Sequence, residues 1–136
     1  MGTRSLVVFQ NEEGEEICSV YRQYDGYPEG RGQQLLDFLK DRHLVYGFGD
    51  TSVRQSNGIE DLAAQWIAWE KTNNSNGKHL VGNVYIYPPN LRDVGEEFVY
   101  TVSENYENKV FTVTCFDVYN RCYYSQEGME KWQTRT

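Results

Sequence analysis

The residues best suited to chemistry in this chain lie in one short segment, YRQYDGYPEGRG, at positions 21–32. Arg22 and Arg31 carry forked guanidinium groups, which match the geometry of phosphate and carboxylate. Tyr24 and Tyr27 add rings for stacking and hydroxyl groups for hydrogen bonds. These residue types favour recognition of a small anionic molecule.

Two carboxylates in the same segment leave its role open. Asp25 could accept a hydrogen bond from a ligand hydroxyl, or it could hold Arg22 in an ion pair. As a general base, Asp25 or Glu29 would make the protein a small hydrolase. Asp-Gly and Pro28 are also ordinary turn residues, so the segment could instead be a structural turn between a strand and a helix.

The rest of the chain offers little support for an enzyme. A nucleophilic enzyme needs Ser, Cys or Lys beside a base, and we find no GxSxG or Cys-His signature around His43 or His79. The segment also lacks the GxGxxG spacing and a Walker lysine. Cys18, Cys115 and Cys122 show no CxxC spacing, so no zinc site is indicated. We therefore expect a non-enzymatic protein that needs neither metal nor cofactor.

Charge and length narrow the classes of partner. With 13 basic and 20 acidic residues the net charge is −7, which disfavours binding to nucleic acid and to anionic membranes. The apolar run in MGTRSLVVF is too short for a secretory signal, and no run is long enough to span a membrane. We expect a cytoplasmic protein whose residues 1–136 form one domain.

The hydrophobic pattern predicts an α+β fold. Periodicity indicates two strands, then two helices, then four strands. The expected ranges are 5–9 and 16–24, 32–42 and 59–71, and 79–87, 96–104, 109–118 and 121–124. The simplest arrangement is one antiparallel sheet of five to six strands, in the order ββααββββ along the chain, with the two helices packed on one face.

Strand alternation and helix position suggest how these elements orient the candidate residues. In the second strand Arg22 shares a face with Val20, where an arginine usually needs a partner. The glycine-bearing turn leads into a helix N-terminus, where free N–H groups favour an anion. Tyr85 and Tyr87 share one face of a later strand, which could line a pocket or form an outer tyrosine-rich surface.

Several segments together give the chain a family resemblance. They are MGTRSL at 1–6, YRQYDGYPEGRG at 21–32, Asn57-Gly58-Ile59, LAAQ at 62–65, YIYP at 85–88, and Asp93, Gly95, Glu96, Glu97 and Tyr100. They resemble the signature of an uncharacterised family of small proteins from bacteria, phages and large DNA viruses. This chain has Arg31 where members often have His, and Glu60-Asp61 where they read GC. The resemblance implies membership, without an activity.

The shared signature ties the N-terminus to the arginine-bearing segment. If the first two strands form a hairpin, the start of the first lies beside the end of the second, which brings Arg4 next to Arg22 and Asp25. We therefore predict a ligand-binding site at this end of the sheet. Its residues are Thr3, Arg4, Arg22, Tyr24, Asp25, Tyr27, Glu29 and Arg31.

Three classes of function follow. The first is a non-enzymatic binding protein, encoded by a phage or virus, that holds a small anionic, nucleotide-like ligand and sequesters a host signal. The second is a protein–protein interaction module, either an inhibitor of a host enzyme or a homo-oligomer. Exposed Trp66, Trp69 or the Tyr85 and Tyr87 face would favour it. The third is a small hydrolase that uses a carboxylate of the segment.

Overall fold

The computed structural model describes residues 2–47, 54–72, 78–119, 122–125 and 132–135, the last two segments as backbone. Its strands are β1 (Ser5–Gln10), β2 (Glu16–Arg22), β3 (His43–Leu44), β4 (Gln55–Ser56), β5 (Val84–Tyr87), β6 (Phe98–Asn105), β7 (Val110–Asp117), β8 (Cys122–Ser125) and β9 (Trp132–Arg135). Its helices are α1 (Gln33–Leu39), which follows a π-helical turn, η1 (Pro28–Gly32), and α2 (Gly58–Thr72). Among these helices none is long and apolar enough to cross a membrane.

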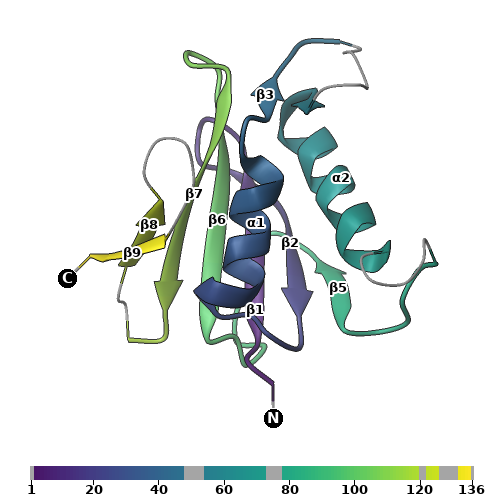
Figure 1. Cartoon of the computed structure of the whole chain (residues 1–136), viewed down its shortest axis with the longest axis vertical. Helices are drawn as coiled ribbons and strands as arrows, with labels where there is room; N and C mark the ends of the chain where they lie inside the picture. The colour runs from purple at the N-terminus through teal and green to yellow at the C-terminus, as the bar shows by residue number, and fades with distance from the viewer. Residues whose placement is uncertain (1, 48–53, 73–77, 120–121, 126–131, 136) are drawn as a thin grey trace.

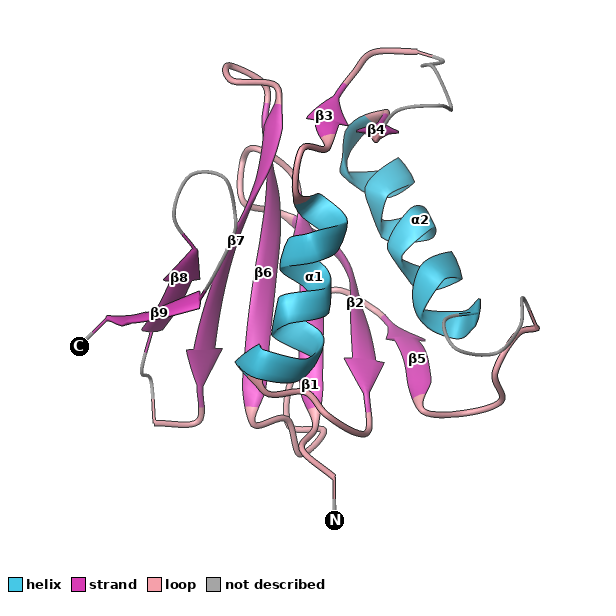
Figure 2. Ribbon diagram, viewed as in Figure 1, coloured by secondary structure: helices cyan, strands magenta, loops and turns pink. Residues whose placement is uncertain are grey.

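Seven strands form one sheet in the order β5-β2-β1-β6-β7-β8-β9, and β3 and β4 form a separate parallel pair (Figure 1). Both helices lie on the same face of the large sheet (Figure 2). The predicted α+β fold is therefore confirmed. The strand β9 lies beyond the predicted runs.

The sheet differs from the prediction in its number of strands, which is seven where five to six were expected, and in one pairing. Every pair of neighbouring strands is antiparallel except β1 and β6, which run parallel from Ser5 beside Phe98 to Gln10 beside Ser103. The cause is the connection after β5, since β5 and β6 run in the same direction and cannot form a hairpin. Residues 88–97 return the chain across the sheet, and β6 enters beside β1.

The sheet is buried on both faces at its centre. In β1 the four residues Leu6, Val7, Val8 and Phe9 are all 0% exposed. Val7 and Phe9 join the main core under the two helices, whereas Leu6 and Val8 form a second cluster on the opposite face. Val94, from the returning segment 88–97, packs on this second cluster. The strand next to the candidate site is therefore held rigidly from both sides.

Candidate functional site

The segment 21–32 packs tightly against the start of β1. The Gly26 N–H donates to the Thr3 carbonyl at 2.9 Å, and the Gly26 carbonyl accepts from the Tyr100 hydroxyl at 2.7 Å. A Cβ on Gly26 would lie 2.6 Å from the Ser5 hydroxyl oxygen, so only glycine fits this close approach. Much of the segment therefore serves as a structural connection between β1, β2 and β6.

The N–H groups that sequence reasoning offered to an anion already have partners. Gly30 and Gly32 donate to the Tyr27 carbonyl at 2.9 and 3.3 Å, and Arg31 donates to the Asp25 carbonyl at 2.8 Å. These bonds close the π-helical turn before α1 begins. These N–H groups are therefore hydrogen-bonded within the protein and are not available to a ligand.

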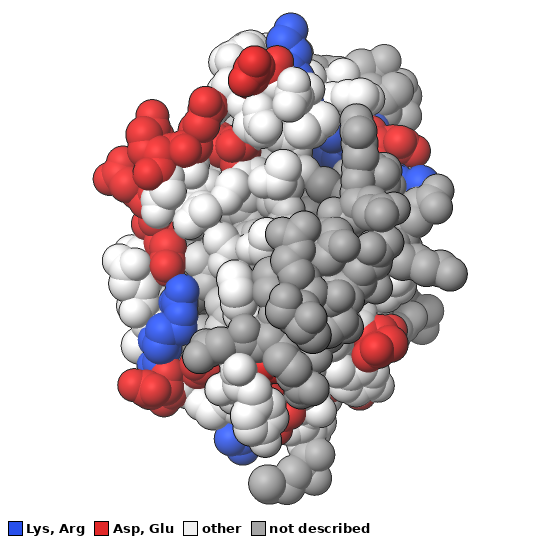
Figure 3. All heavy atoms as spheres, turned by 90° about the vertical axis from the view of Figure 1, so that its left-hand side faces the viewer, with Lys and Arg blue, Asp and Glu red and all other residues white. Residues whose placement is uncertain are grey.

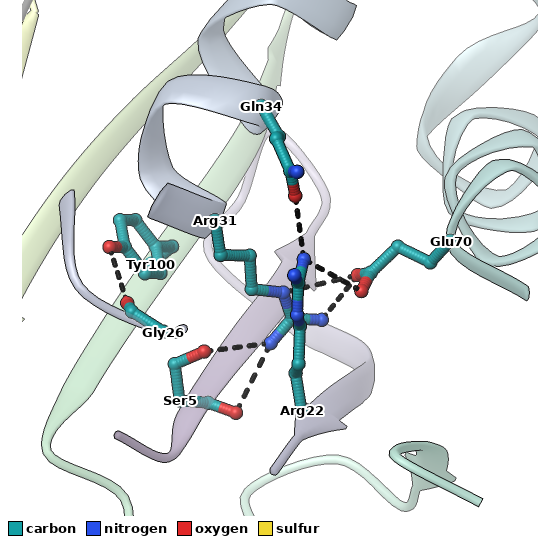
Figure 4. Close-up of polar contacts among 7 residues, drawn as sticks. All are labelled: Ser5, Arg22, Gly26, Arg31, Gln34, Glu70 and Tyr100. Carbon is teal, nitrogen blue, oxygen red and sulfur yellow. Dashed lines mark hydrogen bonds and ion pairs between the residues drawn. The ribbon is translucent and has the colours of Figure 1, made fainter. Parts of the chain in front are cut away.

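Arg31 lies fully buried between the sheet and the helices (Figure 4). Its Nε donates to the Glu70 carboxylate at 3.1 Å, Nη2 contacts the same carboxylate, and Nη1 donates to the Ser5 hydroxyl at 3.0 Å. Burial lowers the pKa of the guanidinium, and the charge of Glu70 opposes that shift. Because its donors face protein acceptors, Arg31 is a structural residue in this arrangement.

Arg22 projects into the same buried cluster from β2. Its Nη1 donates to the Gln34 side chain at 2.6 Å and lies 3.8 Å from Glu70 Oε2, while its buried Nε has no acceptor. The expected partner for this arginine is therefore present, and it comes from α2 instead of Asp25. Arg22 and Arg31 share one carboxylate, which leaves the cluster with a net positive charge (Figure 4).

The other predicted residues of the segment point to solvent. Tyr24 is 52% exposed and Tyr27 39%, and Asp25 and Glu29 are also exposed. The Tyr27 hydroxyl donates weakly to Asp25 at 3.4 Å. The segment thus turns Arg31 inward and its carboxylates outward, so its accessible surface carries negative charge.

Arg4 lies on the opposite face of the sheet from Arg22, although Ser5 pairs with Arg22 across the hairpin. Its guanidinium rests against the segment 88–97, where a Cβ on Gly95 would lie 2.6 Å from Arg4 Nη1. The buried Arg4 Nε has no acceptor. In the described part of the chain Arg4 forms no ion pair or side-chain hydrogen bond. The structure therefore does not bring the Arg4 and Arg22 side chains together.

Several tyrosines lie on the same face of the sheet as Arg4, and they gather around Tyr21. The Tyr21 ring lies 6.1 Å from the Tyr85 ring and 5.7 Å from the Tyr87 ring, measured between centroids. The charge of Arg4 and the phenols of Tyr87, Tyr85 and Tyr24 all affect the pKa of Tyr21. Burial raises the pKa of Tyr21, and Arg4 opposes the shift. We call these residues the Arg4–tyrosine cluster: Arg4, Tyr21, Tyr24, Tyr85 and Tyr87.

Sequence reasoning identified only Arg4 and Tyr24 of this cluster as site residues. Tyr21 carries a signal of its own, because alternation along β2 places it on the face away from Arg22. The pairing of Tyr21 with Tyr85, between β2 and β5, brings the rings together. That pairing joins residues far apart in the chain, which a hydrophobic pattern cannot reveal.

The two tryptophans of α2 do not form the exposed platform considered for a protein partner. Trp66 is 0% exposed, and its ring stacks on Trp69 at a centroid distance of 5.1 Å. Tyr85, by contrast, is 47% exposed on the edge strand of the sheet. Of the aromatic surfaces considered from sequence, the tyrosine surface is the accessible one.

A separate pocket of about 330 Å³ lies on the same face of the sheet as the Arg4–tyrosine cluster. Its lining includes the charged residues Arg92, Glu96 and Glu97 and the apolar residues Val99 and Phe116. The Arg92 guanidinium is held by Glu16 at 3.0 Å. None of the predicted site residues lines this pocket.

Figure 3 shows more acidic than basic side chains on the face that it draws, in keeping with the net charge of −7. The described residues contain no group of three or more His, Cys, Asp or Glu placed to hold a metal ion. Comparison of the chain with protein-family models, with curated proteins and with solved structures found no match.

Proposed function

We propose that the protein is a non-enzymatic binding protein that holds a small anionic, nucleotide-like ligand at the Arg4–tyrosine cluster. The observation that carries this proposal is an arginine with no carboxylate partner, close to Tyr21 and to the tyrosines that gather around Tyr21. The proposal keeps the ligand class expected from the sequence but moves the site to the other face of the sheet. If the chain is encoded by a phage or virus, as its resemblance suggests, sequestration of a host signal would be its role.

The energetics of Arg4 favour an anion. A buried donor without an acceptor destabilises a protein by about 1–3 kcal/mol, and the Arg4 Nε is such a donor. A phosphate or carboxylate at the terminal nitrogens of Arg4 would supply a counter-charge to this guanidinium. The phenols of Tyr24, Tyr85 and Tyr87 form no hydrogen bond within the described part of the chain, so they remain available as donors on this face of the sheet.

The exposed rings support a ligand with an aromatic part. Tyr24 is 52% and Tyr85 47% exposed, so part of each ring is accessible to solvent, and Lys71 Nζ lies 5.7 Å from the centroid of the Tyr85 ring. Stacking of a base on an aromatic side chain contributes about 1–3 kcal/mol. A nucleotide-like molecule would satisfy both features, with its phosphate at Arg4 and its base on a tyrosine.

The segment 88–97, which contacts Arg4 through Gly95, contains a carboxylate that is hydrogen-bonded to its own backbone. Glu96 accepts hydrogen bonds from the backbone N–H groups of Val94 at 2.8 Å and Asp93 at 3.4 Å. Glu97 neighbours Arg4 through its backbone, where its N–H donates to the Arg4 carbonyl at 2.8 Å. No carboxylate lies within ion-pair distance of Arg4 among the described residues.

A thermal-shift and calorimetric panel tests the proposal. Inorganic phosphate, mononucleotides, dinucleotides and cyclic nucleotides are added to the wild type, to Arg4→Gln and to Arg54→Gln. Arg54 lies elsewhere and donates to the Asp37 and Lys40 carbonyls, so its variant controls for net charge. A ligand at one hundred times its Kd should stabilise the wild type and the control by about 2.7 kcal/mol, and Arg4→Gln should lose most of that shift. No shift with any compound, or an equal shift in Arg4→Gln, contradicts the proposal.

A second candidate anion site is the Arg22 end of the buried cluster. Two arginines share Glu70 there, the Arg22 Nε lacks an acceptor, and the Arg22 side chain is 14% exposed. The same panel run on Arg22→Gln separates the two sites. Loss of the ligand shift in Arg22→Gln, with the shift kept in Arg4→Gln, assigns the anion to the helix-covered face.

A further inference from the structure

Among the described residues, β5 is an edge strand of the large sheet and pairs with β2 alone. A free edge presents unpaired backbone N–H and C=O groups, and it is a template for another strand. The four residues of β5, VYIY, carry no charge. Charged side chains, which often protect such edges, are thus absent from this strand.

The register shows which backbone groups face outward. The Gln23 N–H donates to the Asn83 carbonyl at 2.8 Å, and residues of an antiparallel pair alternate between facing each other and facing away. Tyr85 therefore bonds toward β2, whereas Val84 and Ile86 face the open side. The Val84 N–H donates to the Gly82 carbonyl at 2.8 Å. The Val84 carbonyl and both backbone groups of Ile86 remain for a new strand.

The side chains at this edge are unusually exposed for apolar residues. Val81 is 100% exposed, Ile86 64%, Tyr85 47% and Leu80 38%. They are close together in sequence, on β5 and the turn before it. An exposed apolar group of this kind commonly marks an interaction surface.

We propose that β5 pairs with β5 of a second copy of the chain, antiparallel, about a two-fold axis at Tyr85. In this register each Ile86 N–H donates to the Val84 carbonyl of the other copy, so the bonds are reciprocal. A register centred on Ile86 would place Pro88, which has no N–H, opposite that carbonyl. The strand itself carries no charge, and the nearby Lys71 Nζ donates to the Leu80 and Gly82 carbonyls at 3.2 and 3.1 Å. In the pair Ile86 becomes covered.

The pairing would join two Arg4–tyrosine clusters. Residues directly opposite in an antiparallel pair lie on the same face, so Tyr85 of each copy stands beside its equivalent on the face that carries Arg4. One extended surface would then hold both arginines. This consequence rests on the proposed function, whereas the self-association does not.

Analytical ultracentrifugation over a range of concentrations tests the association in the absence of ligand. The wild type should sediment as a dimer, and Ile86→Lys should raise the dissociation constant at least tenfold. Val118→Lys is the matched control, because Val118 is 59% exposed and lies beyond the end of β7. Ile86→Pro removes the outward N–H without adding charge, and it should weaken the dimer in the same way.

Circular dichroism and melting curves confirm that each variant is folded, which is expected because Ile86 is exposed and its N–H does not bond to β2. Added salt should strengthen the dimer, since it screens repulsion between chains of net charge −7. A monomer at all concentrations, or a dimer that Ile86→Lys and Ile86→Pro leave intact, overturns the proposal. Arg4→Gln should dimerise normally, so failure of ligand binding and failure of association are distinguishable.

Discussion

At one end of the molecule, the two faces of the sheet each carry an arginine, and the two arginines differ in whether they have a carboxylate partner. On the helix-covered face, Arg31 is fully buried and bound to Glu70 and Ser5. On the other face, Arg4 rests against Gly95 with no carboxylate within reach among the described residues. An arginine paired with a carboxylate stabilises the core, whereas an arginine without such a partner can bind an anionic ligand. The comparison therefore separates a structural cluster from a candidate site.

The largest expected effect is on the helix-covered face. Glu70→Gln removes the carboxylate shared by Arg22 and Arg31, and breaking a buried ion pair destabilises by about 3–5 kcal/mol. Urea unfolding should show this loss directly. Glu13→Gln, in the exposed turn between β1 and β2, is the control and should stay within about 0.5 kcal/mol of wild type. Equal stability of the two variants would mean that Glu70 does not hold the arginines together.

A smaller effect is expected where Arg4 meets the segment 88–97. Gly95→Ala adds a Cβ at φ +81°, 2.6 Å from Arg4 Nη1, so we expect a loss of about 1–3 kcal/mol. Gly14→Ala has a similar φ of +88° with nothing within 4 Å, so it reports backbone strain alone. The difference between the two unfolding free energies measures the Arg4 contact. If both variants lose the same stability, Arg4 does not lie against Gly95.

Arg4→Gln should change stability least among the arginine variants. Because Arg4 has no ion pair to lose, its unfolding free energy should stay within about 1 kcal/mol of wild type. Arg31→Gln, measured alongside by urea unfolding, should lose several times more. A large loss in Arg4→Gln would show that Arg4 stabilises the fold and would weaken the case for a ligand there.

The smallest effect concerns the pKa of Tyr21. Burial raises this pKa and Arg4 lowers it, so Arg4→Gln should raise it further. The phenolate absorbance near 295 nm, compared with Tyr21→Phe, measures the change. A raised pKa means that the folded chain keeps the proton longer than the unfolded chain. Stability is therefore full below the ordinary tyrosine pKa of about 10 and falls as pH rises through the folded value. A lower pKa in Arg4→Gln would contradict this electrostatic contact.

The hydrophobic pattern predicted where the main helices and strands lie, but it did not predict which strands and side chains pair with one another. The spacing of apolar residues located α2 within one or two residues of its bounds, Gly58–Thr72. Alternation along β2 also predicted that Arg22 would need a buried partner. It could not identify Glu70, which is remote in sequence, and it could not predict the parallel pairing of β1 with β6. Such pairings depend on how a long connection crosses the sheet.

The predicted site combined Arg4 and Arg22, although the sequence pattern already indicates that they lie on opposite faces of the sheet. Ser5 pairs with Arg22, so alternation places Arg4 on the opposite side from Arg22. Tyr21, on the Arg4 side, could have been included on the same ground. The inward turn of Arg31 had no such signal, because it depends on the π-helical turn that precedes α1.

The hydrogen bond from Tyr100 to the Gly26 carbonyl joins residues 74 positions apart, and the pairing of β1 with β6 spans still more of the chain. Contacts of this range require much of the chain to be ordered before they form, which slows folding. The turn at 21–32 cannot reach its final form until β6 has docked beside β1. We therefore expect the candidate site and the far half of the sheet to form together, in one late cooperative step.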